Sequence, residues 1–240
     1  MKRKNLIIMF TSIIGAGLIS GFVLYKPIVD EGSAFPSQEK NNEIIDLPEP
    51  NYESNVSVEE ALQKRRSVRE YTNSPLTVQE ISQLLWAAQG ITKPSRGFRT
   101  APSAGALYPL EVYVVIDQVK ELDQGVYKYN MRDHNLKRLK SGRFNRKVAE
   151  AALGQSSIRQ AAAQIIFSAV YERTTQKYGE RGIRYVHMEA GHAAQNVFLQ
   201  AESLGLGTVT IGAFNDDNLE ELLNMPEKET ALYILPLGRI

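Results

Sequence analysis

The pattern of apolar and polar positions divides the chain into three parts. Three cations near the amino terminus precede an uncharged, mostly apolar stretch that runs from Leu6 to Tyr25. A polar segment rich in Pro, Glu, Asn and Ser follows, and after it helix-like and strand-like patterns continue to the end of the chain. We therefore predict an N-terminal segment over residues 1–26, a linker over 27–56 and one folded domain over 57–240.

Two capping boxes, each a Ser or Thr followed three residues later by Glu, mark the first helices of this domain. They predict one helix from Val58 to about Arg66 and a second over 78–89, which Gly90 ends. Further helices are expected over 146–153, over 184–204 and from a cap at Asp216 to about 224. Strands are expected over 110–117, 164–172, 208–214 and 229–238, with a hairpin over 125–140. Since helices and strands are mixed without regular βαβ alternation, the predicted fold class is α+β.

The apolar stretch from Leu6 to Tyr25 has the length of a membrane span. Its twenty residues, at about 1.5 Å each, reach about 30 Å as a helix, which matches the hydrocarbon thickness of a bilayer. A buried core helix of this length would carry a polar stripe, whereas this stretch has only Thr11, Ser12 and Ser20. We therefore expect an N-terminal transmembrane helix.

The flanking charges give the expected orientation. Three cations precede the span, whereas Asp30 and Glu31 follow it after a single Lys26. By the positive-inside rule the chain would cross the cytoplasmic membrane once, with the folded domain outside. A cleaved signal peptide, with its best small-residue site at 32–34, is the alternative, and the domain would then be secreted.

Charge and cysteine content exclude several classes of function. The chain has 28 Lys and Arg against 27 Asp and Glu, a net charge of +1, and no cysteine. Such a balance does not give the basic surface that nucleic-acid binding needs, so no nucleic-acid partner is expected. Disulfides, thiolate metal sites and a Cys nucleophile are excluded. His187 and His192 lie five residues apart, off the spacing of two ligands on one helix face, so no metal site is predicted.

A dense group of cations follows the first predicted helix. Arg65, Arg66 and Arg69 surround Ser67, and together they could bind a phosphate through charge-assisted hydrogen bonds. Cations at a helix C-terminus also complement the helix dipole, so the two interpretations stay open at this point. A loop of small residues over 101–109 could let a flat ligand approach the backbone, or could be a simple turn. Arg239, after the last strand, could be another anion ligand or a solvated side chain.

Five sequence strings resemble the nitroreductase family, most closely its SagB-type dehydrogenases. They are RRSVREY at 65–71, APSAGALYPLEVYVV at 101–115, EAGHAAQNVFLQAESLGLG at 189–207, TVTIGAF at 208–214 and LPLGR at 235–239. The resemblance implies a nitroreductase-like α+β fold, with a central mixed or antiparallel sheet flanked by helices. It also implies a homodimer that holds FMN non-covalently at the dimer interface.

The resemblance also assigns residues to FMN. Arg65, Ser67 and Arg69, with Arg66 beside them, look like the family's phosphate and flavin-ring contacts, and Arg239 looks like a late phosphate contact. The loop beside the isoalloxazine would be Ser103, Ala104, Gly105, Ala106 and Leu107, although many nitroreductases have Asn where this chain has Ala106. The backbone facing flavin N5 would be Ile211, Gly212 and Ala213.

The implied activity is that of an FMN-dependent oxidoreductase that transfers hydride through flavin N5 to or from a small molecule. Azoline-oxidising members carry a Lys-Tyr pair, and Arg184 and Tyr185 occupy that place here. Arginine stays protonated, so Tyr185 is the candidate for catalytic proton transfer, unless it is a core aromatic. An exported enzyme would more plausibly act as a dehydrogenase, because NAD(P)H is a cytoplasmic reductant. The alternatives are an NAD(P)H-dependent nitro or quinone reductase and a non-catalytic flavin-binding protein.

Overall fold

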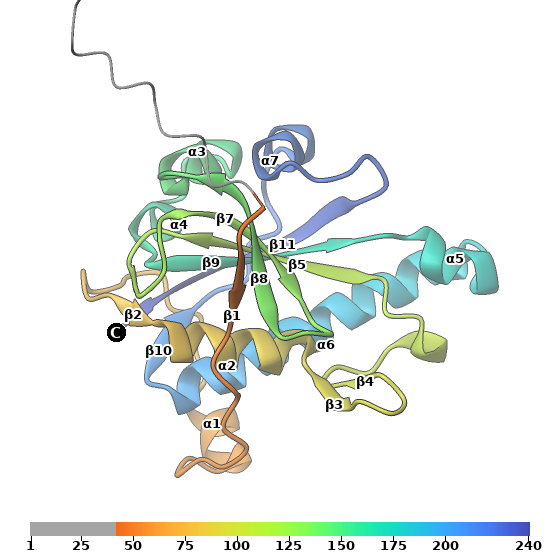
Figure 1. Cartoon of the computed structure of the whole chain (residues 1–240), viewed down its shortest axis with the longest axis horizontal. Helices are drawn as coiled ribbons and strands as arrows, with labels where there is room; N and C mark the ends of the chain where they lie inside the picture. Colours follow the sequence, from red (N-terminus) through yellow and green to blue (C-terminus); the bar gives the residue numbers. More distant parts are fainter. Residues whose placement is uncertain (1–41) are drawn as a thin grey trace, which may run out of the picture. The chain divides into compact units, whose positions relative to one another are not determined.

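The computed structural model describes residues 42–240, which are built around one seven-stranded sheet (Figure 1). Every pairing within this sheet is antiparallel. Its order is β1 (Ile44–Asp46), β8 (Asn135–Ser141), β7 (Gly125–Asn130), β5 (Leu110–Ile116), β9 (Ala163–Ala169), β11 (Thr230–Arg239) and β10 (Leu206–Thr208). Two small ladders accompany it, β2 (Leu76–Thr77) with β6 (Val119–Lys120) and β3 (Ile91–Lys93) with β4 (Phe98–Arg99). Of the two predicted alternatives for the central sheet, the antiparallel one is confirmed.

Helices cover both faces of the central sheet. Figure 1 shows α2 (Val78–Gln89) and α6 (Arg181–Ser203) on one side, with α1 (Val58–Lys64) beyond them. The other side carries α3 (Asn145–Ala151), α4 (Ser156–Gln160) and α7 (Asp216–Leu223). The remaining helices are η1 (Ala104–Ala106) and α5 (Glu172–Tyr178). The α+β prediction is therefore confirmed for the described residues.

The alternation of side chains along β5 explains why the sheet has two buried faces. Val112 and Val114 pack into the core shared with α2 and α6, whereas Tyr113 and Val115 pack into the core shared with α3 and α7. Successive side chains of a strand point to opposite faces, so a continuous apolar run is what a strand between two helical layers requires.

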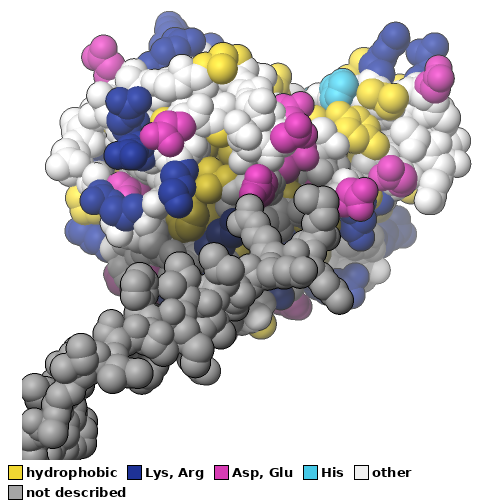
Figure 2. Space-filling model, turned by 90° about the horizontal axis from the view of Figure 1, so that it is seen from above, with side chains coloured by type: hydrophobic (Ala, Val, Ile, Leu, Met, Phe, Trp, Pro, Cys, Tyr) yellow, Lys and Arg dark blue, Asp and Glu magenta, His cyan; other side chains and the backbone are white. Residues whose placement is uncertain are grey.

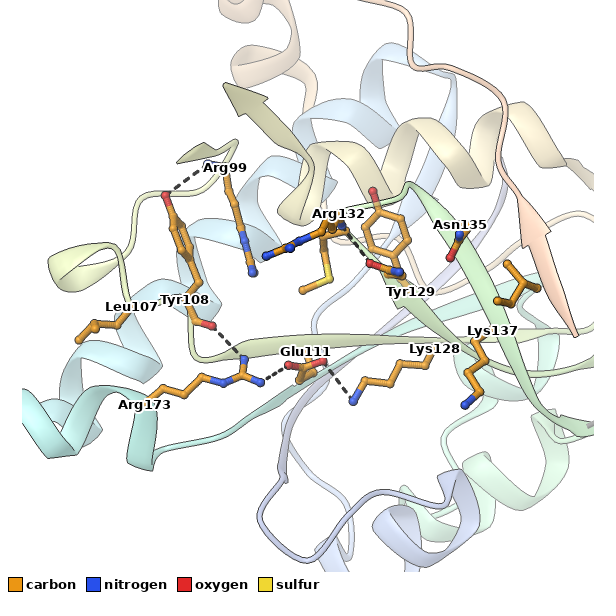
Figure 3. A pocket seen from close by; sticks show the side chains of 13 residues that line it. Arg99, Leu107, Tyr108, Glu111, Lys128, Tyr129, Arg132, Asn135, Lys137 and Arg173 are labelled. Atoms are coloured by element: carbon orange, nitrogen blue, oxygen red, sulfur yellow. Dashed lines mark hydrogen bonds and ion pairs between the residues drawn. The ribbon is translucent and has the colours of Figure 1, made fainter. Parts of the chain in front are cut away.

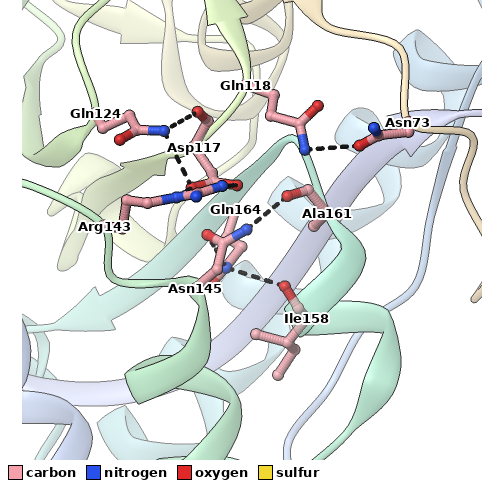
Figure 4. Close-up of polar contacts among 9 residues, drawn as sticks. All are labelled: Asn73, Asp117, Gln118, Gln124, Arg143, Asn145, Ile158, Ala161 and Gln164. Carbon is pink, nitrogen blue, oxygen red and sulfur yellow. Dashed lines mark hydrogen bonds and ion pairs between the residues drawn. The ribbon is translucent and has the colours of Figure 1, made fainter.

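Buried amide side chains fix the short helix α4 onto the end of the sheet (Figure 4). Gln164, on β9, donates to the Asn145 side chain at 2.8 Å and to the Ile158 carbonyl at 3.3 Å. Asn145 donates in turn to the Ala161 carbonyl at 2.6 Å. Because α4 has only five residues and no side-chain cap, these tertiary bonds replace the cooperativity that so short a helix lacks.

Residues 42–56 correct the predicted linker. Their strand β1 pairs with β8 from Ile44 to Asp46, Leu47 is buried, and the Asn51 amide donates to the Gln83 side chain at 2.7 Å. The polar composition of the segment concealed this strand, because an edge strand is held mainly by backbone bonds and needs few apolar side chains. The folded domain therefore starts earlier than residue 57.

The expected strand over 208–214 is also wrong beyond its first residue. Strand β10 ends at Thr208, and only Ile211 returns to the sheet, as an isolated bridge to Ile234. The register places Pro236 of β11 opposite the gap, and proline has no N–H to donate to the ladder.

Two other element boundaries differ from the prediction. Asn215 rather than Asp216 caps α7, and β9 ends at Ala169 before α5 begins.

None of the helices in residues 42–240 is both long and apolar enough to cross a bilayer. The predicted span from Leu6 to Tyr25, like the first part of the predicted linker, lies outside the described residues.

His134 joins the first described segment to the rest of the domain. Its Nε2 lies 2.7 Å from the Ser82 hydroxyl and 3.1 Å from the Pro48 carbonyl, and its Nδ1 lies 2.7 Å from the Tyr129 hydroxyl. Since a carbonyl only accepts, Nε2 carries the proton and Nδ1 accepts from Tyr129. Burial is the main cause that lowers the pKa of His134 below its ordinary value.

We expect this cluster to make stability depend on pH. Because the folded state lowers the pKa of His134, the unfolded chain takes up the proton first, so the stabilisation is complete above about pH 6.5 and is lost below it. Replacing His134 with Phe should cost about 1–3 kcal/mol at about pH 8, because the Tyr129 hydroxyl loses its partner. His134 should make the free energy of unfolding, measured with urea, lower at about pH 5 than at about pH 8. The variant should lack this contribution of His134. Equal pH profiles for the two proteins would contradict this.

Candidate functional site

The chain leaves α1 as an extended segment that lies along the ends of β10 and β11. The Val68 amide donates to the Thr208 carbonyl of β10, and the Thr72 amide donates to the Arg239 carbonyl of β11, both at 2.9 Å. The Tyr71 hydroxyl donates to the Val68 carbonyl at 2.9 Å. We call residues 65–72 the arginine segment. The residues of this segment that are predicted to bind an anion thus lie at the same strand end as Arg239, although Arg239 is far away in the sequence.

Two glycines allow this close approach. A Cβ on Gly207 would lie 2.7 Å from Val68, and a Cβ on Gly238 would lie 2.5 Å from the Tyr71 ring. Real Cβ atoms do not make contacts this short. The strand ends are therefore shaped to accept the arginine segment.

The cations of this site differ in what they bind. Arg66 donates to the Gln63 and Arg65 carbonyls, as the helix-terminus interpretation expects. The Arg239 guanidinium donates to both carboxylate oxygens of Glu80, at 2.8 and 3.0 Å. Arg65 lies over the Phe198 ring at 5.1 Å.

Ser67 and Arg69 differ from those three cations. They are exposed, and neither side chain has a hydrogen-bond or ion-pair partner among residues 42–240. Ser67 and Arg69 are therefore the exposed donors of the arginine segment that are available to a ligand. The half-buried Arg65, which contacts the Phe198 ring, also has no hydrogen-bond or ion-pair partner for its side chain among residues 42–240.

Backbone donors are available a short way along the chain, after β10. The Ile211 amide and carbonyl both bond to Ile234. The next two amides, of Gly212 and Ala213, have no acceptor among residues 42–240, and both residues are exposed. The bridge at Ile211 therefore holds two adjacent N–H groups at the surface, where they can donate to a bound molecule.

Gly212 also lines a cavity of about 490 Å³ with Tyr171, His187, Ala190 and Phe214. The Tyr171 hydroxyl lies 2.6 Å from His187 Nε2. Burial, and next the Asp216 carboxylate, raise the pKa of Tyr171, so its hydroxyl stays protonated at neutral pH. Sequence reasoning missed Tyr171, and it considered His187 only as a metal ligand.

Within residues 42–240 no group of three His, Asp or Glu side chains could hold a metal ion.

The loop over 103–107 has a strained backbone. Gly105, Ala106 and Tyr108 all have positive φ, at 63°, 54° and 47°, which is costly for the two residues other than glycine. The Ser103 hydroxyl accepts from the Tyr108 amide at 2.9 Å and fixes the turn. Ser103 and Ala104 are half-buried at its start, Ala106 is exposed at its tip, and Leu107 is half-buried at its end.

Tyr185 reaches this loop through a second tyrosine. Its ring packs edge-on against that of Tyr178, with centroids 5.2 Å apart. A Cβ on Gly105 would lie 2.8 Å from the Tyr178 hydroxyl, so Tyr178 is the tyrosine that touches the loop. Sequence reasoning missed this residue of α5, because nothing in the sequence indicates which side chains of α5 and α6 meet.

A buried carboxyl group lies beneath the same loop. Glu189, on α6, is 2% exposed and lies near enough to Ser103 for that hydroxyl to affect the pKa of its carboxyl group. One of its carboxylate oxygens has no partner within residues 42–240. Burial raises the pKa of Glu189 to about 7, although Ser103 and Arg99 oppose the shift. Glu189 can therefore hold or release a proton near neutral pH, a property that the sequence did not reveal.

A second cavity, of about 580 Å³, is lined in part by Leu107 and Tyr108 (Figure 3). We call it the basic pocket, because five of the residues that line it are cations and one is an acid. These residues are Arg99, Lys128, Arg132, Lys137, Arg173 and Glu111.

Comparison with known proteins gives a consistent result. The model of the nitroreductase family matches residues 62–239. A candidate nitroreductase of Methanocaldococcus jannaschii, MJ1384, is 52% identical over 184 residues, which cover 77% of this chain and 91% of that one. A solved structure of a candidate nitroreductase from Anabaena variabilis is 32% identical, with a TM-score of 0.73, and covers 87% of this chain and 45% of that one.

Two more distant relatives are longer than the matched region. The microcin B17-processing protein McbC of Escherichia coli is 26% identical over 67% of this chain. An NAD(P)H FMN reductase of Bacillus subtilis is 28% identical over 74% of it. The chain spans 61% of the length of each of them.

Proposed function

The chain belongs to the nitroreductase family, whose members are oxidoreductases, and from this premise we propose that it binds FMN and oxidises or reduces a small molecule. When bound, FMN supplies hydride transfer at its N5 atom. The observation that carries the proposal is the set of donors without acceptors: Ser67 and Arg69 on the arginine segment, and the amides of Gly212 and Ala213. A molecule with a phosphate at one end and a ring rich in acceptors at the other carries the chemical groups that these two sets of donors would bind.

Each group of donors has its own task in this proposal. Ser67 and Arg69, with Arg65 beside them, would bind the phosphate. The Gly212 and Ala213 amides would donate to the edge of the ring that carries N5. Arg239 would help only by keeping the end of β11 in place, because Glu80 already binds its guanidinium. Glu189, with its pKa raised to about 7, can both hold and release a proton near neutral pH, whereas Tyr185 packs against Tyr178.

Flavin titrations of the purified full-length chain in detergent test the proposal. FMN should bind more tightly than riboflavin, and replacing Arg69 with Ala should weaken FMN binding about 10- to 100-fold. Riboflavin binding should stay unchanged, because riboflavin has no phosphate. Replacing the exposed Arg146 of α3 with Ala is the matched control and should change neither. Absence of flavin binding, or an equal loss for both flavins, would overturn the proposal.

The direction of the reaction is the finer part of the proposal. The similarity to an NAD(P)H FMN reductase favours reduction of a substrate by NAD(P)H, whereas the SagB-like resemblance favours oxidation. Anaerobic mixing separates the two, because NADH or NADPH should bleach the bound flavin in the first case and a thiazoline peptide should do so in the second. If neither NAD(P)H nor any member of a broad panel of candidate substrates bleaches the flavin, the chain would be a flavin-binding protein without turnover. Nitroreductase-family members are often homodimers, and we include a homodimer in the proposal.

We also propose that the domain is anchored outside the cytoplasmic membrane, in the orientation that the positive-inside rule gives. The support is the apolar stretch from Leu6 to Tyr25 behind three cations. A C-terminal fusion to a reporter that is active only in the cytoplasm should be inactive. An active fusion would reject this topology.

A further inference from the structure

The basic pocket has an unusual charge balance. Its only carboxylate, Glu111, accepts from Arg173 at 2.6 Å and pairs with Lys128 at 3.1 Å. Lys128 has a further acid partner, Glu229, at 2.6 Å. Glu111 and Glu229, which lies outside the pocket lining, thus neutralise Lys128 and Arg173. Arg99, Arg132 and Lys137 have no ion pair among residues 42–240.

Arg99 faces the pocket in a fixed position. The carboxylates of Glu189 and Glu111 favour its charge, but it forms no direct ion pair among residues 42–240. Its Nη1 donates to the Gln89 side chain at 2.8 Å, and its guanidinium stacks on the Tyr108 ring at 4.5 Å. Figure 3 shows the side chains of Arg99 and Arg132 pointing into the same space. Burial lowers the pKa of Arg99, yet a guanidinium stays charged in proteins. A half-buried cation of this kind favours an anion beside it.

The chain as a whole is not basic, since it has 28 Lys and Arg against 27 Asp and Glu. On the face seen in Figure 2, Lys and Arg side chains are interspersed with Asp and Glu. The pocket, with five cations and one acid, therefore has a local excess of positive charge on a molecule whose charges are otherwise mixed.

The rest of the pocket wall is mostly apolar or aromatic, with the two amide side chains of Asn130 and Asn135 among it. Leu107, Tyr108, Tyr129 and Met131 line it beside the cations. Its volume of about 580 Å³ is within the usual range for small-molecule sites. A ligand with both an apolar body and an anionic group would satisfy both parts of the wall.

We propose that the basic pocket binds an organic oxyanion, a carboxylate or phosphate carried on an apolar or aromatic body, and that this is the substrate class of the enzyme. Arg99 and Arg132 would bind the oxyanion, while Leu107 and Tyr108 would contact the apolar body. Leu107 also belongs to the 103–107 loop that the family resemblance puts beside the flavin. The assignment as substrate rests on the proposed FMN function, whereas the binding of the oxyanion does not.

Direct binding tests the pocket without flavin. Anilinonaphthalene sulfonate, a fluorescent aromatic anion, should bind the full-length chain, and benzoate or phenyl phosphate should displace it, whereas neutral benzamide should not. The more effective of these two competitors identifies the oxyanion as a carboxylate or as a phosphate.

The variant Arg132→Ala tests the role of Arg132, which is exposed and has no ion-pair partner among residues 42–240. It should bind the anionic competitors at least about 10-fold more weakly. The Arg146→Ala variant is the control and should bind them normally. Equal displacement by benzamide, or no effect of Arg132→Ala, would overturn the proposal.

Turnover connects the pocket to the reaction. With NADPH as donor, Arg132→Ala should lower kcat/KM for para-nitrobenzoate about 10-fold relative to para-nitrobenzamide, with FMN affinity unchanged. If the chain fails to bind FMN but still binds benzoate through Arg132, the proposed function is wrong and the oxyanion site stands. If FMN binds and the two nitro compounds are reduced equally well by both proteins, the substrate assignment is wrong and the proposed function stands.

Discussion

Replacing Lys128 with Met should lower the free energy of unfolding by about 3–5 kcal/mol, because it leaves the buried carboxylate of Glu229 without its cation. Glu229 is 3% exposed, and its carboxylate accepts from Lys128 Nζ at 2.6 Å. Its other oxygen accepts from the Tyr113 hydroxyl at 2.7 Å and from Ser168 at 2.9 Å. These neutral donors satisfy hydrogen bonds but carry no charge. Met has a similar shape to Lys, so the change mainly removes the ammonium group.

The neighbouring Glu111 increases this effect. Burial alone would raise the pKa of Glu111, but Lys128 and Arg173 together hold it below its ordinary value. Without Lys128 this second carboxylate keeps only Arg173 as a cation partner among residues 42–240. The ammonium of Lys128 therefore stabilises two acids, Glu111 on β5 and Glu229 in the loop just before β11.

Urea unfolding of three variants separates charge from packing. Lys128→Met should show the full loss, and adding Glu229→Gln should recover a large part of it, because the neutral amide no longer requires a cation. Replacing the exposed Lys147 with Met is the control and should change stability by less than about 0.5 kcal/mol. A loss below about 1 kcal/mol for Lys128→Met, or no recovery in the double variant, would contradict a charge-based role.

The elements with local signals could be predicted from the sequence. The Thr77 box is present in full, with the Glu80 side chain bonding back to the Thr77 backbone, and Gly90 ends α2 as expected. The apolar run at 110–116 forms the central strand β5. In each case the residues that determine the element lie within a few positions of each other, so a single sequence contains the information.

Elements that depend on distant partners were missed. Strand β1 exists because β8 offers it a free edge, and the strand after Thr208 is interrupted because Pro236 lies opposite. Neither partner is near in sequence. The raised pKa of Glu189 likewise depends on burial beneath a loop more than 80 positions away in sequence.

The residues of the candidate site were assigned by resemblance and not by spacing, and their part in binding stays a prediction. Arg66 bonds to the helix end, as the dipole interpretation expects, whereas the side chain of Arg69 has no partner among residues 42–240. The basic pocket could not be predicted, because Arg99, Arg132 and Arg173 come from separate elements that only the fold brings together.

Replacing Gly238 with Ala should detach the arginine segment and with it most of the affinity for FMN. The new Cβ would lie 2.5 Å from the Tyr71 ring, so the ring must move, and the Tyr71 hydroxyl would lose its bonds to the Val68 and Pro236 carbonyls. Overpacking of this kind costs about 1–3 kcal/mol. Because Ser67 and Arg69 are positioned by the same segment, FMN affinity should fall by about 100-fold or more, whereas deletion of a single side chain removes one contact.

Gly191→Ala is the matched control for this prediction, since Gly191 lies within α6 and a Cβ there would meet no atom within 4 Å. Alanine is the better helix former, so this variant should be as stable as the parent or slightly more stable. Hydrogen exchange gives a readout that does not depend on flavin: the Val68 and Thr72 amides, which bond to β10 and β11, should lose protection in Gly238→Ala and keep it in Gly191→Ala. Full protection of both amides in Gly238→Ala would show that the strand end tolerates the methyl group. Lost protection together with unchanged FMN affinity would show that the arginine segment does not bind the phosphate, so the two measurements test the packing and the function separately.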